Sequence, residues 1–302
     1  MNASFQALAA KRRGDLFVPL IFRLALRLEQ VSWDEALEDA PLAAHALRSA
    51  QRLFGTDACV NWFDTGLEAE ATGVNFARDS LGEISAGAVA QADLPDPGAF
   101  IATPAIAHVL AVTRQLCETI GEHACVLGCL TGPATLLLRF FGSPGAKRLV
   151  AGLDAGKLAT TDRQRLDKVA SLSVALARAY CELGVGGLAL LEEAVPQSPA
   201  LAGAFDSLFN LASYYGVPIV VVSRASMSSG VCDMYAKLGA GYIVAPGSQD
   251  GRVEAIAPGK LSEMNASVPH PKGAGRLVAT TWEVPADTAP ESLAAFGARL
   301  KR

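Results

Sequence analysis

The chain has 302 residues, 51% of them hydrophobic, and a formal net charge of −4. This length fits one large α/β domain over residues 1–302. The net negative charge argues against a nucleic-acid-binding surface. No apolar run approaches the roughly 18 residues of a membrane span, and the basic residues 11–13 are not followed by the apolar h-region of a secretory signal. We therefore expect a cytoplasmic protein without a membrane segment.

Apolar runs and helical patterns alternate along the whole chain. The predicted strands are Phe17–Phe22, Ala58–Phe63, Ala124–Leu130, Gly187–Leu191, Pro218–Val222, Tyr242–Ala245, Arg252–Ile256 and Arg276–Thr281. The predicted helices are Trp33–Leu53, Pro104–Ile120, Thr161–Leu183, Leu201–Tyr215, Val231–Leu238 and Pro290–Leu300. The run Pro218–Val222 is continuous and β-branched, which is typical of a parallel strand buried on both faces.

About eight strands separated by helices favour a single (β/α)8 barrel, the TIM-barrel architecture. The region Pro246–Pro271 contains Gly, Pro and Ser and has no convincing helical pattern. We therefore expect the barrel to be irregular near its seventh βα unit.

Six cysteines are spread along the chain, mostly inside apolar runs. This distribution is typical of small buried side chains and not of a disulfide framework. Cys125 and Cys129 lie on one predicted strand, about 13 Å apart, which is too far for a shared metal ion. We predict that the chain holds no metal.

The segment Phe63–Gly73 follows the second predicted strand and delivers a carboxylate, Asp64, at the end of that strand. Parallel α/β sheets and barrels bind ligands at this end, so Asp64 is a candidate catalytic residue. Alternatively, Asp64 caps the next helix. The small, acidic residues behind it, including Glu68, are too polar for a core strand and too few for a full helix, and they predict a pocket loop.

Glu192 and Glu193 end another apolar strand. Alternation along the strand places one of them at the barrel mouth, where a carboxylate can act as an acid or base or orient a substrate. Arg139 lies in a strongly apolar helix start, where it either binds a ligand or pairs with Glu193 or Asp64.

Three further positions are open to two interpretations. Arg23 and Arg27 lie among apolar residues after the first strand, so each either extends toward solvent or faces a cavity. His270 lies between two prolines in the irregular region, where it is either solvated or part of the site.

Several segments, in this order, resemble the uroporphyrinogen decarboxylase superfamily, which also contains corrinoid-dependent methyltransferases. They are Val18–Arg23 with Arg27, Phe54–Ala58 running into Asp64 and Glu68–Gly73, Leu130–Leu136, and Trp282–Glu291. The resemblance covers the chain from about Phe17 to Leu300 and implies a (β/α)8 barrel.

In the decarboxylases of this superfamily, two arginines spaced i, i+4 bind substrate carboxylates, and an aspartate holds pyrrole N–H groups. Arg23, Arg27 and Asp64 fall on these positions. However, the tyrosine of the decarboxylases is replaced by Arg139, and their serine falls near Glu193. Charges of both signs at these places argue against decarboxylation of uroporphyrinogen.

The methyltransferase branch resembles the chain more closely, through the Glu-Ala-Glu-Ala segment and the C-terminal Glu-Val-Pro motif. Its thiol-methylating members hold zinc through a His-x-Cys and a late Cys. Here these positions are Ser223-Arg224-Ala225 and Trp282, which cannot make a nitrogen and sulfur zinc site. We retain Ser223 as a candidate for substrate binding.

The resemblance implies a methyltransferase-like enzyme that moves a methyl group between a small substrate and a corrinoid (cobalamin) on a partner protein, or tetrahydrofolate. Asp64, Glu68 and Glu193 would position or protonate the substrate. The other candidates for substrate binding are Arg23, Arg27, Arg139, Ser223 and His270. Two alternatives stay open: a decarboxylase acting on an anionic tetrapyrrole or polycarboxylate, and a non-catalytic barrel that binds a homologous subunit. A homodimer is compatible with each.

Overall fold

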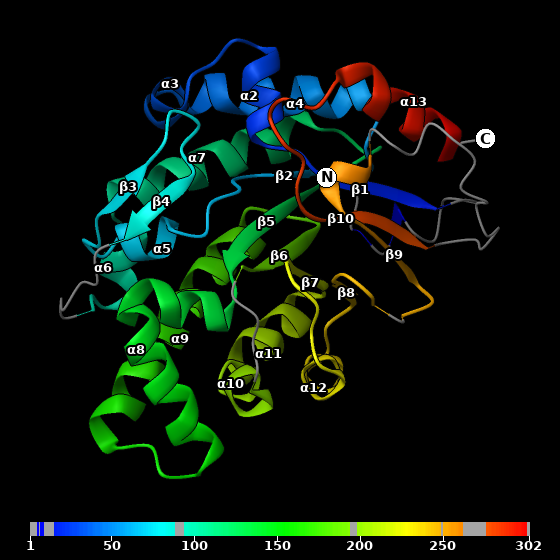
Figure 1. Ribbon diagram of the computed structural model, residues 1–302. Helices are drawn as coiled ribbons and strands as arrows, with labels where there is room; N and C mark the ends of the chain where they lie inside the picture. The colour runs from blue at the N-terminus through cyan, green and yellow to red at the C-terminus, as the bar shows by residue number, and fades with distance from the viewer. Residues whose placement is uncertain are drawn as a thin grey trace.

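A computed structural model describes residues 5, 7–8, 15–87, 94–193, 198–248, 250–261 and 276–300. The predicted site residue His270 lies outside these ranges. The chain forms an α/β fold in which helices lie around two parallel sheets (Figure 1).

Eight parallel strands make up the two sheets. The smaller sheet has the order β1 (Leu16–Leu20), β10 (Leu277–Glu283) and β9 (Val253–Ile256). The larger sheet has the order β2 (Ala58–Val60), β5 (Cys125–Thr131), β6 (Gly187–Glu192), β7 (Ile219–Ser223) and β8 (Tyr242–Val244). All residues of β1, β5, β6 and β7 are buried, which explains their continuous apolar character. The eight predicted strands are thus confirmed, with their ends shifted by a few residues.

The two sheets meet where β1 lies next to the start of β2. The backbone N–H of Asp57 donates to the carbonyl oxygen of Phe17 over 2.8 Å. In return, the N–H of Phe17 donates to Oδ2 of Asp57 over 2.7 Å. This reciprocal pair ties the end strands of the two sheets together.

The helices occupy the outside of the sheets (Figure 1). They are α2 (Arg23–Leu28), α3 (Trp33–Glu38), α4 (Ala40–Phe54), α5 (Leu67–Glu70), α6 (Pro97–Ile101), α7 (Pro104–Thr119), α8 (Pro133–Asp154), α9 (Thr160–Glu182), α10 (Pro199–Gly203), α11 (Asp206–Tyr215), α12 (Ser229–Leu238) and α13 (Pro290–Leu300).

Two predicted helices are each divided in the structure. Trp33–Leu53 is broken at Asp39, whose side chain accepts a hydrogen bond from the N–H of Leu42 and begins α4, with Pro41 in its first turn. An aspartate cap followed by proline is a typical helix start, so the prediction of one continuous helix was wrong. Leu201–Tyr215 is likewise divided into α10 and α11.

The described part of the region Pro246–Pro271 is irregular, as the sequence predicts. In the described residues between β8 and β9, 245–248 and 250–252, the chain forms no helix. After β9 comes one turn of 3-10 helix, η1 (Pro258–Lys260). Another irregularity is the antiparallel hairpin of β3 (Phe76–Arg78) and β4 (Ile84–Gly87), which the sequence did not predict. Within the described part of the chain, no helix has the length and apolar character needed to cross a membrane.

Candidate active site

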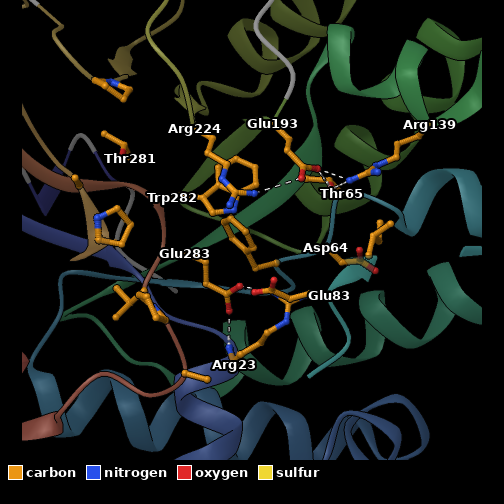
Figure 2. Close-up of a pocket in the computed structure, with 18 residues that line it drawn as sticks. Arg23, Asp64, Thr65, Glu83, Arg139, Glu193, Arg224, Thr281, Trp282 and Glu283 are labelled. Atoms are coloured by element: carbon orange, nitrogen blue, oxygen red, sulfur yellow. Dashed lines mark hydrogen bonds and ion pairs between the residues drawn. The ribbon is translucent and has the colours of Figure 1, made fainter. Parts of the chain in front are cut away.

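A cavity of about 440 Å³ lies at the C-terminal ends of the parallel strands. Segments that follow β1, β2, β6, β7, β8 and β9 form its wall together with the end of β10. Its charged lining residues are Arg23, Asp64, Glu83, Arg139, Glu193, Arg224 and Glu283 (Figure 2). Parallel α/β folds bind ligands at this end, which makes the cavity the candidate active site.

One group of side chains, which we call the open cluster, surrounds Glu193. It consists of Thr65, Arg139, Glu193 and Arg224 (Figure 2). Nη2 of Arg139 contacts Oε2 of Glu193 and also donates to Oγ1 of Thr65 over 3.0 Å. Thr65 in turn donates to Oε2 over 3.1 Å, and Nη1 of Arg224 lies 3.5 Å from Oε1. Two guanidinium groups therefore share one carboxylate.

The neighbouring carboxyl group, Glu192, anchors the start of α8. Its oxygens accept hydrogen bonds from the N–H groups of Ala134 and Thr135, each over 3.1 Å, and from the hydroxyl of Tyr235 over 3.0 Å. Burial raises the pKa of Glu192 to about 7. A Cβ atom on Gly132 would lie 2.3 Å from Cδ of Glu192, which explains the glycine in the Thr-Gly-Pro sequence before α8.

Strand alternation therefore separates the two glutamates, as predicted. Glu192 is completely buried, while Glu193 lines the cavity. The hydroxyl of Thr135 accepts a hydrogen bond from the N–H of Glu193 over 2.8 Å. Arg139 lies one helical turn after Thr135 in α8. Thr135 therefore helps to position both residues of the Arg139–Glu193 pair.

A second group, which we call the closed cluster, holds the opposite side of the cavity. It consists of Arg23, Trp33, Asp64, Arg78 and Glu283. The backbone N–H of Arg23 donates to Oε1 of Glu283 over 2.6 Å, and its Nη1 contacts Oε2. Its Nε donates to the carbonyl of Leu81 over 2.7 Å and its Nη2 to that of Gly82 over 3.2 Å. All three side-chain nitrogens of Arg23 are thus used by the protein.

Arg78, from the β3–β4 hairpin, fixes Asp64 within the closed cluster. Its Nη2 donates to Oδ2 of Asp64 over 2.8 Å, and its Nη1 donates to the carbonyl of Gly82 over 2.6 Å. Its Nε and Nη2 also bind Glu70. The ring of Trp33 lies 5.5 Å from the guanidinium of Arg23 and 5.3 Å from that of Arg78. Such cation–π contacts add to the ion pairs that hold both arginines.

Gly82 lets the hairpin reach these arginines. Its φ of +78° lies in the left-handed region, and a Cβ atom there would lie 2.2 Å from Cδ2 of Trp33. Only a glycine can therefore lie this close to the ring of Trp33. In this position the carbonyl oxygen of Gly82 accepts hydrogen bonds from both Arg23 and Arg78.

The structure places Asp64 at the cavity and does not make it the cap of α5, whose N-cap is Gly66. Oδ1 of Asp64 accepts a hydrogen bond over 2.9 Å from Gly66, the residue before α5. The prediction of a pocket loop behind it was wrong, because residues 67–70 form the short helix α5, whose Leu67 and Ala69 are buried.

Glu68 lies on the buried side of α5 and is not part of the cavity lining. Its two oxygens accept hydrogen bonds from the N–H of Thr131, over 2.7 Å, and from the Thr131 hydroxyl. Burial raises the pKa of Glu68 to about 7, against the lowering effect of these hydrogen bonds. A role of Glu68 in substrate binding stays a prediction.

Two other predicted residues also lie outside the cavity lining. Arg27 is exposed and donates to the carbonyl of Thr288 over 3.0 Å. Ser223 is buried at the end of β7, where its hydroxyl donates to the carbonyl of Ala225 over 2.7 Å. Their roles in substrate binding stay predictions.

Several residues of the site received no role from the sequence, among them Thr65, Arg78, Arg224 and Glu283. Arg224 follows β7 just as Glu193 follows β6, so the rule that singled out Glu193 also points to it. Glu283 ends β10 and lies in the cavity wall, and burial raises its pKa to about 7, against the opposing effect of Arg23. Its position at the end of a strand was the available signal.

The positions that the sequence resemblance assigns to zinc in thiol methyltransferases do not fit this metal. The Ser223 hydroxyl is bonded within its own loop, and Trp282 packs edge-to-face against Phe63, with ring centroids 5.1 Å apart. Neither offers the imidazole or thiolate that zinc prefers. Among the described residues, no three His, Cys, Asp or Glu side chains are grouped for metal binding.

Comparisons with known proteins identify the family and the fold. The sequence profile described as Uroporphyrinogen decarboxylase (URO-D) matches residues 20–198. The solved structure of a methyltransferase from Methanosarcina mazei superposes with a TM-score of 0.75 and 16% sequence identity, over 99% of this chain and 98% of that chain. No curated protein sequence matches significantly.

Proposed function

We propose that this chain, which belongs to the uroporphyrinogen decarboxylase family, is a methyltransferase-like enzyme acting on a small substrate in the 440 Å³ cavity. The methyl group moves between this substrate and a corrinoid or another one-carbon carrier, such as tetrahydrofolate. A partner protein presents the carrier at the C-terminal ends of the strands.

The fold that we infer for this function is a (β/α)8 barrel. The reciprocal hydrogen bonds between Phe17 and Asp57 support closure between β1 and β2. The similarity to the Methanosarcina mazei structure over nearly the whole chain supports the same fold.

The mixed charge of the cavity carries the proposal. Four carboxyl groups, those of Asp64, Glu83, Glu193 and Glu283, lie in a wall with three arginines. Such a wall repels a polycarboxylate, and the volume lies in the lower part of the range of about 300–1,000 Å³ for small-molecule sites. Both observations favour a small substrate over a large anionic macrocycle.

The chemistry needs a proton at the substrate and a fixed substrate orientation. When a methyl group leaves an oxygen or nitrogen, the heteroatom keeps the bonding electron pair and takes up one proton. The carboxyl groups of the cavity wall are the candidate donors of this proton. Asp64 is held by Arg78 and orients the substrate, and Glu193 is held by Arg139 on the other side of the cavity. A corrinoid would supply the nucleophilic cobalt that takes the methyl group.

A methyl-transfer assay tests this function. A panel of methoxy and N-methyl donors is incubated with the protein and either cob(I)alamin or tetrahydrofolate. We expect transfer from at least one donor, abolished in Asp64→Ala. The matched control is Asp162→Ala, since Asp162 pairs with exposed Arg148 outside the cavity over 3.0 Å. Asp64→Asn is tested in parallel, in case Asp64→Ala is unstable without the Arg78 partner. Absence of turnover with either carrier across the panel rejects the proposal.

Decarboxylation is the second candidate, because Arg23 and Asp64 both line the cavity. Incubation with uroporphyrinogen would then release CO₂, with a proton taking the place of each lost carboxylate. No CO₂ at high protein concentration excludes this reaction. A non-catalytic subunit would give neither product and would co-purify with a homologous partner.

A further inference from the structure

We propose that Arg139 and Arg224 form a subsite for an oxyanion of the substrate, and that Glu193 occupies this subsite in the free protein. The inference deepens the proposed function and rests on it for the view that the cavity takes a small substrate. It assigns the substrate a carboxylate or a phosphate group.

The hydrogen-bond donors of the two arginines carry the argument. Among the described residues, Arg139 uses only Nη2 for hydrogen bonds, and its Nε is buried without a partner. For Arg224, the ion pair of Nη1 with Glu193 is the side chain's one polar contact within the described part of the chain. A guanidinium group carries five N–H donors in a fork that matches an oxyanion. The buried Nε of Arg139 is closed to a ligand, so the donors that the described contacts leave for one are Nη1 of Arg139 and the Nε and Nη2 of Arg224.

The charge of this subsite also favours an anion. Two guanidinium groups and one carboxylate leave one net positive charge. Of the other carboxylates of the lining, Glu283 is bound to Arg23 and Asp64 to Arg78, and Glu83 lies near Glu283 and Arg23 (Figure 2). The Arg23 side chain is only 9% exposed and uses all three of its nitrogens, while that of Arg224 is 60% exposed. An incoming oxyanion thus meets available donors in the open cluster and not at Arg23.

The subsite has an apolar wall on one side. The guanidinium of Arg224 lies 5.9 Å from the ring of Trp282, which packs against Phe63. Arginine stacked on an aromatic ring keeps its in-plane donors directed outward. A planar or apolar body attached to the oxyanion can therefore lie against Trp282 while the arginines bind the charge.

Glu193 behaves in this account as a built-in competitor. Its two oxygens contact the two arginines that would bind the substrate oxyanion. Replacing its negative charge while keeping its shape leaves the arginines with two net positive charges. Anion binding should then become stronger, whereas loss of either arginine should weaken it.

Isothermal titration calorimetry at low ionic strength tests the subsite with three probes: benzoate, phenyl phosphate and the neutral isostere benzamide. We expect benzoate, phenyl phosphate or both to bind, which identifies the type of oxyanion. Arg224→Met and Arg139→Met should each weaken this binding by about tenfold or more. Glu193→Gln should strengthen it by about tenfold and leave benzamide binding unchanged. Arg148→Met, an exposed arginine outside the cavity, is the matched control.

Failure of both anions to bind overturns the inference. So does equal anion affinity in the wild type and Arg224→Met, or weaker binding in Glu193→Gln. Arg224→Met decides the question alone if Arg139→Met does not fold, because Arg224 is exposed. The readout is binding and not turnover. Absence of methyl transfer with intact anion binding therefore rejects only the proposed function, and transfer without dependence on Arg224 rejects only the subsite.

Discussion

The open and closed clusters contain the same kinds of residues but use them differently. In the closed cluster, Nε, Nη1 and Nη2 of both Arg23 and Arg78 donate to carboxylates or carbonyls of the protein. In the open cluster, the described contacts of Arg139 and Arg224 involve one nitrogen of each. An arginine whose N–H donors all bond to the protein stabilises the fold, whereas an arginine with unused N–H donors can bind a ligand.

The largest expected effect is on stability, from Arg23→Met. This change leaves the buried carboxyl of Glu283 without its cation, which typically costs about 3–5 kcal/mol of unfolding free energy. Arg224→Met should cost less than about 1 kcal/mol, because its ion pair is exposed. Chemical denaturation measures both values. The double variant Arg23→Met/Glu283→Leu should recover part of the loss. Equal losses in the two single variants would remove the distinction between the clusters.

A pH effect of intermediate size should come from Glu192, which anchors the open cluster. Its pKa is about 7 in the folded protein and near 4.5 when unfolded, so the folded state binds more protons between these values. The contribution of Glu192 to the free energy of unfolding is therefore fully present below pH 4.5. It is lost as the pH rises to 7, by on the order of 3 kcal/mol. When the pH is raised from 4.5 to 7.5, the free energy of unfolding should decrease less for Glu192→Gln than for the wild type. Identical pH profiles would contradict this.

The smallest expected effect concerns Thr65, which joins the partners of the open cluster. Thr65→Val keeps the shape but removes the hydroxyl that donates to Glu193 and accepts from Arg139. We expect about a threefold change in anion affinity, with stability changed by less than about 1 kcal/mol. Calorimetry and thermal unfolding measure the two quantities. A loss of stability as large as that of Arg23→Met would place Thr65 with the closed cluster.

The sequence predicted the strands well because each is a buried apolar run with a clear end. The same logic placed Asp64 and Glu193 at the cavity, since each follows a strand. Applied to β7 and β10, it would also have selected Arg224 and Glu283.

The partners of the charged residues were harder to predict. Arg78 lies on a three-residue strand with no alternating pattern, and it meets Asp64 only because the hairpin folds back over α5. Gly66 permits that approach, since a Cβ atom there would lie 2.9 Å from Nη2 of Arg78. Such contacts depend on the tertiary fold and not on local periodicity. By contrast, the Arg139–Glu193 pair was among the sequence-based alternatives: Arg139 lies near the start of α8, which follows β5, and Glu193 follows the neighbouring strand β6.

The most direct test of the central claim is a crystal structure of the protein soaked with selenate, an oxyanion that anomalous scattering locates. The account predicts a selenate ion in the cavity, within hydrogen-bond distance of Arg139 and Arg224, with Arg23 still bound to Glu283. Selenate bound at Arg23, with that ion pair broken and the open cluster unchanged, would contradict it.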